Sequence, residues 1–285
     1  MIRKAVIPAA GLGIRLLSAT KEQPKEMLPL FARSVDGQIR VRPLLQIVFE
    51  ELYDAGLREF CFVVGRGKRV VEDFFTPDEA FVENLKSRKR PDLAQELDRF
   101  YKKIGSSVVM FVNQPQPRGF GDAIYSVRAF TGGDQFIVHA GDDLIISKDN
   151  NHLIRLIDAY KKYDAEVAFF VEKVKDPTKY GVIEGNEVDP RVYKVQNIVE
   201  KPKVPPSNMA IVAIYIFNSS IFQALETTKA DKNREIQLTD AIQQLVQKKH
   251  KVYAVELNQD QRRIDIGTPE SYWQALTTTY KSNSF

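Results

Sequence analysis

The sequence predicts an α/β fold, with a Rossmann-like, doubly wound mixed sheet and a β-rich second lobe. In the first half, short apolar runs alternate with amphipathic helical patterns, which is typical of a mostly parallel sheet covered on both faces. After Ala165 the runs follow one another with few helices between them, which indicates hairpins. No linker or internal repeat interrupts the chain, so we expect one domain over residues 1–285.

Each element of the first half follows from its own pattern. Continuous apolar runs predict buried strands at 5–7, 60–64, 108–112 and 136–140. Helical spacing of apolar residues predicts helices at 43–55, 121–130 and 151–163. The long polar segment 78–105 is also helical in pattern, and Pro91 begins its second half.

The second half is richer in strands. Apolar and alternating runs predict strands at 165–174, 182–184, 192–199, 209–217 and 252–257, and helices at 237–248 and 269–280. The pairs Gly185-Asn186 and Asp189-Pro190 are turn signals, so we expect a hairpin bend at each.

Composition excludes several classes of protein. With 44% hydrophobic residues the chain is not disordered, and 41 basic against 37 acidic residues leave a surplus of only four charges, so no nucleic-acid partner is expected. The lone Cys61 excludes an internal disulfide and is expected in the core. No apolar stretch is long enough to span a bilayer. We therefore expect a cytoplasmic protein with no membrane partner.

The most informative segment is the glycine loop after the first predicted strand, Gly11-Leu12-Gly13-Ile14-Arg15. A dinucleotide fingerprint would need a small residue at Leu16, and the spacing of a P-loop is absent. A glycine turn followed by Arg15 and Lys25 suits a nucleoside triphosphate, because amides and cations together hold phosphates. From these residues alone, an ordinary turn with surface cations is about equally well supported.

Two acidic sites follow apolar stretches, at Asp142-Asp143 and at Asp265. Ligands of open α/β sheets bind at the carboxyl ends of strands, and Mg²⁺ prefers one or two carboxylates plus water and phosphate oxygens. A strand-end turn is the simpler interpretation while these residues are considered alone.

The order of these motifs along the chain resembles the sugar-1-phosphate nucleotidylyltransferases, above all the bacterial and archaeal uridylyltransferases that use UTP and glucose 1-phosphate. The resemblance begins with the glycine loop and the Pro-Lys-Glu-Met-Leu-Pro motif around Lys25. It continues through 65–69, 114–123, 141–144, 176–182, 199–202, 235–240 and 265–268, and so spans almost the whole chain.

The resemblance implies a reaction and a role for each charged residue. The phosphate of glucose 1-phosphate would attack the α-phosphorus of UTP, giving UDP-glucose and pyrophosphate. Arg15 would stabilise the leaving pyrophosphate, Lys25 the triphosphate, and Lys201 the sugar phosphate. Asp142 and Asp265 would hold one Mg²⁺, while Asp143 is the less certain ligand and would be structural.

The resemblance also implies how the substrates are recognised. Residues 1–164 would mainly bind the nucleotide, through Ala10, Gly11, Gly13, Gln114 and Gly119. Residues 165–285 would mainly bind the sugar and close the site, with Gly181 leaving room for the sugar and Glu200 accepting hydrogen bonds from its hydroxyl groups. UTP and glucose 1-phosphate are thus the expected partners, in a homo-oligomer (dimer or tetramer).

Several residues depart from the family pattern, and alternatives stay open. Ile14, Asp122, Ala213-Ile214 and Arg234 replace residues common in these enzymes, so the resemblance fixes neither the contact at Asp122 nor the choice between dimer and tetramer. A thymidylyltransferase using dTTP is the first alternative, because thymine and uracil share one hydrogen-bonding edge. The segments 78–105 and 65–69 favour the uridylyl group. A non-catalytic nucleotide-sugar binding protein is the second alternative, which the presence of Arg15, Lys25, Asp142 and Asp265 disfavours.

Overall fold

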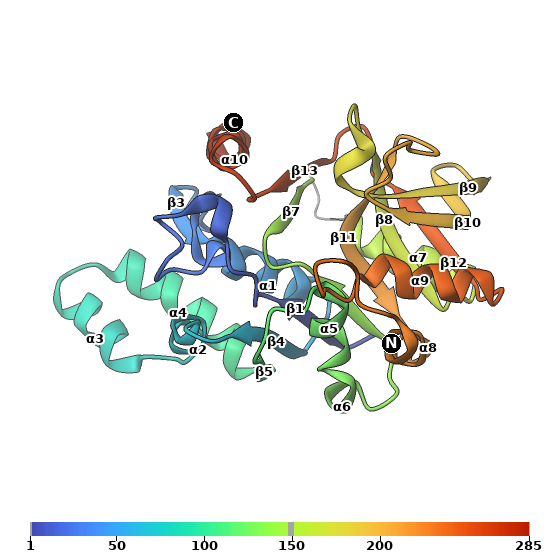
Figure 1. The fold of residues 1–285 in the computed structure, drawn as a ribbon. Coiled ribbons are helices and arrows are strands. Elements are labelled where there is room, and N and C mark those ends of the chain that lie inside the picture. Colours follow the sequence, from blue (N-terminus) through green and yellow to red (C-terminus); the bar gives the residue numbers. More distant parts are fainter. Residues whose placement is uncertain (1, 148–150, 285) are drawn as a thin grey trace.

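A nine-stranded mixed sheet forms the centre of the protein (Figure 1). The computed structural model describes residues 2–147 and 151–284. In sheet order the strands are β5 (Val108–Gln114), β4 (Glu59–Gly65), β1 (Lys4–Pro8), β6 (Phe136–His139), β11 (Met209–Phe217), β8 (Val167–Lys173), β12 (Val252–Glu256), β10 (Val192–Glu200) and β9 (Gly181–Asp189). The predicted mixed sheet is therefore confirmed.

The sheet divides into a parallel and a largely antiparallel part. From β5 to β6 all neighbours are parallel, so the four strands end at the same edge. From β6 onward the pairs are antiparallel except for β8 with β12. β9 also pairs with β11 at Ala210 and Val182, so the antiparallel part curls back on itself. The change of rhythm after Ala165 marks this transition.

Helices cover both faces of the sheet. They are α1 (Leu44–Asp54), α2 (Arg69–Phe74), α3 (Glu79–Ser87), α4 (Pro91–Gly105), α5 (Phe120–Tyr125), α6 (Arg128–Thr131), α7 (His152–Lys162), α8 (Ser220–Thr227), α9 (Leu238–Gln247) and α10 (Pro269–Ser284). Alternate residues of each strand belong to two separate cores, because successive side chains point to opposite faces. Helices α1, α4 and α7 pack into one core, and α5, α8 and α9 into the other. The expected core position of Cys61 is confirmed.

Two small sheets were not predicted. One is a hairpin of β2 (Pro29–Arg33) and β3 (Ile39–Pro43); the other joins β7 (Asp143–Ile146) to β13 (Arg262–Asp265). The strands of the second lie more than 100 residues apart, so no local pattern could identify their pairing.

Two predictions in the middle of the chain were wrong, and one helix was not predicted. Gly185-Asn186 is no turn, because β9 continues through it, and the pairing with β10 shifts register there between Val195 and Asn197. The bend lies at Asp189-Pro190 instead. The predicted helix 121–130 is two short helices, α5 and α6. Helix α8 follows β11 in a region where few helices were expected.

The C-terminal helix returns to the N-terminal half. The hydroxyl of Tyr272 donates to the carbonyl of Pro29 at 3.1 Å, and the Nδ2 of Asn283 donates to that of Phe31 at 3.1 Å. Helix α10 thereby holds the β2–β3 hairpin beside β7 and β13 (Figure 1). Among the described residues, no helix combines the length and apolar character needed to cross a membrane.

His152 at the start of α7 is a buried polar residue. The side chain is 0% exposed, and within residues 2–147 and 151–284 neither ring nitrogen has a hydrogen-bond partner. Its ring lies 6.1 Å from that of Phe170. Burial, and to a smaller extent the neighbouring His139 and Arg155, lower the pKa of His152 to about 3. The folded protein therefore holds this imidazole neutral.

This burial predicts an acid sensitivity. Because the folded pKa lies below the unfolded value, the stabilisation is complete above pH 6.5 and is lost as the pH falls toward 3. Lowering the pH from 7 to 5 should cost about 2 kcal/mol through this group. Denaturant unfolding of His152→Leu should show a pH dependence that is shallower than that of the parent protein by this amount. Parallel profiles for His152→Leu and the parent would refute the assignment.

Candidate active site

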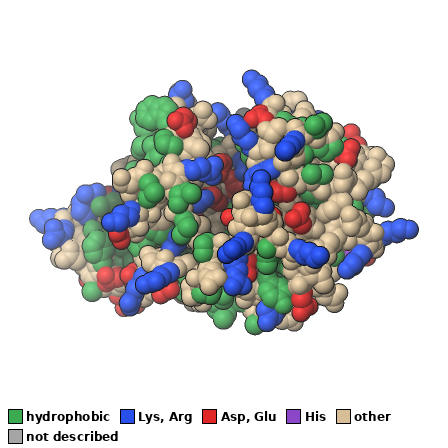
Figure 2. Space-filling model, in the orientation of Figure 1, with side chains coloured by type: hydrophobic (Ala, Val, Ile, Leu, Met, Phe, Trp, Pro, Cys, Tyr) green, Lys and Arg blue, Asp and Glu red, His purple; other side chains and the backbone are tan. Residues whose placement is uncertain are grey.

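A cleft of about 390 Å³ opens at the carboxyl ends of the parallel strands. The loops after β1, β5 and β6 line it, together with residues from the second lobe. Its lining includes eight of the predicted site residues: Ala10, Gly11, Gly13, Arg15, Lys25, Gln114, Gly119 and Asp142. On this face the molecule is hollowed between its two lobes, with acidic side chains in the hollow and Lys and Arg around it (Figure 2).

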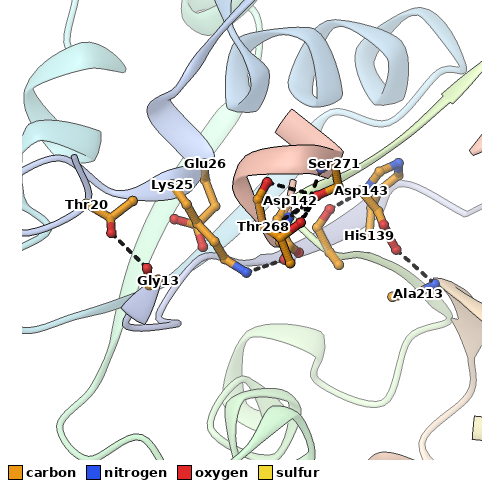
Figure 3. A network of polar contacts seen from close by, with 12 residues as sticks. Gly13, Thr20, Lys25, Glu26, His139, Asp142, Asp143, Ala213, Thr268 and Ser271 are labelled. Carbon is orange, nitrogen blue, oxygen red and sulfur yellow. Dashed lines mark hydrogen bonds and ion pairs between the residues drawn. The ribbon is translucent and has the colours of Figure 1, made fainter. Parts of the chain in front are cut away.

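The glycine loop has a conformation that only glycine adopts easily. Gly13 has a φ of +64°, and a Cβ there would lie 3.1 Å from the Cβ of Thr20. The hydroxyl of Thr20 donates to the carbonyl of Gly13 at 2.7 Å, which closes the loop (Figure 3). The short 3₁₀ turn Ile14–Leu16 follows at once and presents the exposed Arg15 at the cleft.

Lys25 points into the cleft from the 3₁₀ turn Lys25–Met27 and forms an ion pair with Asp142 (Figure 3). Burial opposes the charge on both groups. The attraction between them, their hydrogen bond and the neighbouring charged groups together outweigh burial, so the pKa of Lys25 is raised and that of Asp142 is lowered. The site therefore holds both groups charged near neutral pH.

A second ion pair lies beneath the first. Lys68, after β4, donates to Glu26 at 2.9 Å, and the two side chains are 9% and 2% exposed. Burial raises the pKa of Glu26, and the ammonium groups of Lys68 and Lys25 oppose that shift. The sequence placed both residues in recognised motifs, but their pairing was not predicted, because it joins the loops of two strands.

Asp143 is held by protein groups and is structural, as expected. Arg263 donates to it from Nε at 3.0 Å and from Nη2 at 3.1 Å, and the carboxylate is 2% exposed. The β7–β13 register places Asp265 directly opposite Asp143. Burial, with the carboxylates of Asp143 and Asp142, raises the pKa of Asp265 to about 6. These acids thus form a repelling group that a cation would relieve.

Arg15 reaches the same acidic group across Gly267. A Cβ at Gly267 would lie 2.7 Å from the Oδ2 of Asp265 and 3.0 Å from the Nη2 of Arg15. The glycine therefore allows carboxylate and guanidinium to approach one another at the edge of the cleft. Asp265 itself lines a neighbouring cavity of about 190 Å³, together with Tyr180 and Arg263.

At the other end of the cleft, Gln114 is buried at the end of β5. Its Nε2 donates to the carbonyl of Gly119 at 3.2 Å and to Asp122 at 2.7 Å. The backbone of Ile236 packs against the same loop, where it accepts from the amide of Gly121 at 2.9 Å. The departure at Asp122 thus has a definite contact, which the sequence could not show.

The three predicted sugar residues lie together on the second lobe, outside this cleft. Gly181 and Glu200 are register partners on β9 and β10. Glu200 accepts from the hydroxyl of Thr239 at 2.9 Å and pairs with the Nζ of Lys201 at 2.9 Å. Lys201 is more than half exposed, so its ammonium is available to a ligand.

Comparison with known proteins agrees with this arrangement. The model of the nucleotidyl transferase family matches residues 4–282. The chain is 36% identical over 281 residues to the UTP–glucose-1-phosphate uridylyltransferase of Bacillus subtilis, covering 98% of this chain and 90% of that protein. It is 40% identical over 274 residues, covering 94% and 89%, to a Methanocaldococcus jannaschii protein that carries the same name provisionally.

The fold is also that of a solved member. A crystal structure of UDP-glucose pyrophosphorylase complexed with UDP-glucose aligns with a TM-score of 0.84 at 36% identity, covering 99% of this chain and 100% of that one. The chain therefore belongs to the nucleotidyl transferase family and is, within it, a relative of the UTP–glucose-1-phosphate uridylyltransferases.

Proposed function

We propose that this protein transfers a uridylyl group from UTP to glucose 1-phosphate, forming UDP-glucose and releasing pyrophosphate. The observation that carries the proposal is the cleft itself, which collects the glycine loop, Arg15, Lys25, Asp142 and Gln114. At one end of the cleft, Gln114 would contact the base. At the other end, Arg15 and Lys25 would bind the phosphates. The named relatives and the solved neighbour support the choice of UTP and glucose.

The chemistry needs no general base. A phosphate monoester is largely dianionic at neutral pH, so glucose 1-phosphate is already a nucleophile. The protein then contributes positioning and charge neutralisation. Lys25 would exchange part of its contact with Asp142 for phosphate oxygens, while Arg15 would meet the charge that develops on the leaving pyrophosphate.

Asp142 and Asp265 have the chemistry of a magnesium site. Two carboxylates suffice for Mg²⁺ when substrate phosphates and water complete its shell. Burial, followed by the carboxylates of Asp143 and Asp142, raises the pKa of Asp265, and a bound cation would favour its ionised form. Bound Mg²⁺ would neutralise charge on the reacting phosphates. We assign these two residues as its ligands, with Asp143 engaged by Arg263 instead.

On the sugar side, we assign Glu200 as the acceptor for hydroxyl groups and Lys201 as the contact for the sugar phosphate. Glu200 has a carboxylate that is one fifth exposed and already fixed by Thr239, so it is positioned before a ligand arrives. The expectation that Gly181 leaves room for the sugar was wrong, because a Cβ there would lie 2.7 Å from the Cγ2 of Thr239 and 3.1 Å from the Oε2 of Glu200. The glycine instead lets these two side chains pack against β9.

The activity is tested by pyrophosphate release. Purified protein should release pyrophosphate with glucose 1-phosphate and Mg²⁺ when UTP is supplied, and the nucleotide product should be UDP-glucose by mass spectrometry. Parallel reactions with dTTP, CTP, ATP and GTP define the base preference. Faster turnover with dTTP would indicate a thymidylyltransferase, and no release with any nucleotide would leave only a binding function.

The metal assignment makes a separate prediction. Asp142→Asn and Asp265→Asn should each lower kcat by about 100-fold or more, because one charge-stabilising contact in the transition state is lost. Both should also raise the Mg²⁺ concentration for half-maximal rate. Asp98→Asn on the distant α4 is the matched control, and melting temperatures check the fold. Near-parental rates at equal Mg²⁺ would exclude the two residues as ligands.

Glu200→Gln tests the sugar assignment. Loss of a charged hydrogen-bond acceptor should raise the KM for glucose 1-phosphate by about 10-fold, and the KM for UTP should stay within about twofold. Glu184→Gln is the control on the same strand pair, because its carboxylate contacts Asn197 instead. A change confined to the KM for UTP would show that Glu200 does not contact the sugar.

A further inference from the structure

The hydrogen bonds of Gln114 fix which atom of its side-chain amide faces the cleft. The NH₂ group donates to two acceptors, the carbonyl of Gly119 at 3.2 Å and the carboxylate of Asp122 at 2.7 Å. A primary amide has two N–H donors, so both are used. No group in the described part of the chain donates to Oε1, and Oε1 is not among the fully buried unbonded atoms, so it stays accessible to a ligand. Gln114 therefore offers the cleft an acceptor.

Asp122 decides this polarity. An ionised carboxylate only accepts hydrogen bonds, so it attracts the NH₂ group and would repel Oε1 if the amide were turned over. The carbonyl of Gly119 acts in the same sense, but the contact with Asp122 is shorter and charged, which makes it the stronger of the two. Asp122 lines the far side of the loop and is absent from the cleft wall, so it acts through Gln114.

An accessible acceptor distinguishes pyrimidine bases by the proton at N3. Uracil and thymine carry N3–H, which is a donor, whereas the N3 of cytosine is an acceptor. A triphosphate held at the glycine loop and Lys25 limits how far the base can shift to find another pairing. A cytosine at the same depth would therefore place its N3 lone pair against that of Oε1, and both buried acceptors would be unpaired.

We propose that Asp122 is a specificity-determining positioning residue, which fixes the amide of Gln114 so that Oε1 accepts from N3–H of the base and selects uracil or thymine against cytosine. This inference rests on the proposed function, since it takes the base end of the cleft to be at Gln114. The inference adds Asp122 as the residue that sets the selectivity. It also predicts that the site does not distinguish UTP from dTTP.

The test compares Asp122→Asn with the parent protein. An asparagine can donate or accept, so it no longer dictates the orientation of Gln114. The dissociation constants of UTP, dTTP and CTP are measured by calorimetry without sugar, and kcat/KM by pyrophosphate release. The preference for UTP over CTP should fall by about tenfold, on the order of one hydrogen bond gained or lost. The ratio of UTP to dTTP should not change, because both bases carry N3–H.

Two further variants keep the result unambiguous. Asp122→Ala removes the acceptor entirely and should also lower the preference, which covers failure of the asparagine variant to fold. Asp98→Asn should leave all three nucleotides unaffected. An unchanged ratio of UTP to CTP in both folded Asp122 variants, or equal losses with every nucleotide, would overturn the inference while the activity with UTP stood. Failure of the parent to bind or use UTP would instead overturn the proposed function.

Discussion

The ion pair between Arg263 and Asp143 is the contact on which the arrangement of the site depends. It joins β13 to β7 across more than 100 residues, with both side chains almost fully buried. The same guanidinium reaches Glu172 of the antiparallel part at 3.2 Å. Arg263 fixes the carboxylate of Asp143, and the β7–β13 register sets Asp265 opposite it. The pKa of about 6 at Asp265, which burial and its carboxylate neighbours cause, is the consequence of this assembly.

Buried charges are concentrated at the cleft, although burying a charge costs stability. Their presence there therefore favours a functional explanation. Lys25 with Asp142 and Lys68 with Glu26 place two ion pairs at the base of one cleft. Buried pairs contribute little net stability, because desolvation offsets their attraction, yet removing one partner is strongly destabilising. The pair of Lys25 and Asp142 holds both of its groups charged at the cleft, a role that apolar side chains of the same size could not perform.

The chain around the start of α9 connects the cleft to the second lobe. The backbone of Ile236, just before α9, bonds to Arg118 and to Gly121 beside Gln114, with distances of 2.7 and 2.9 Å. In the first turn of α9, Thr239 donates to Glu200 on the second lobe. The surroundings of Gln114 and the carboxylate of Glu200 are thus held by one short stretch of chain.

The sequence by itself determined the class of fold, most strands and helices, and many of the glycines and charged residues that line the cleft. Buried strands read as continuous apolar runs, and the loops at their ends carry the glycines and charges, so both signals are local. Only the tertiary structure decided which charges meet: that Arg263 engages Asp143, that Lys68 neutralises Glu26, and that Asp122 turns the amide of Gln114. These contacts join loops and strands distant in the chain, and a hydrogen bond depends on ångström-scale geometry that residue spacing does not encode.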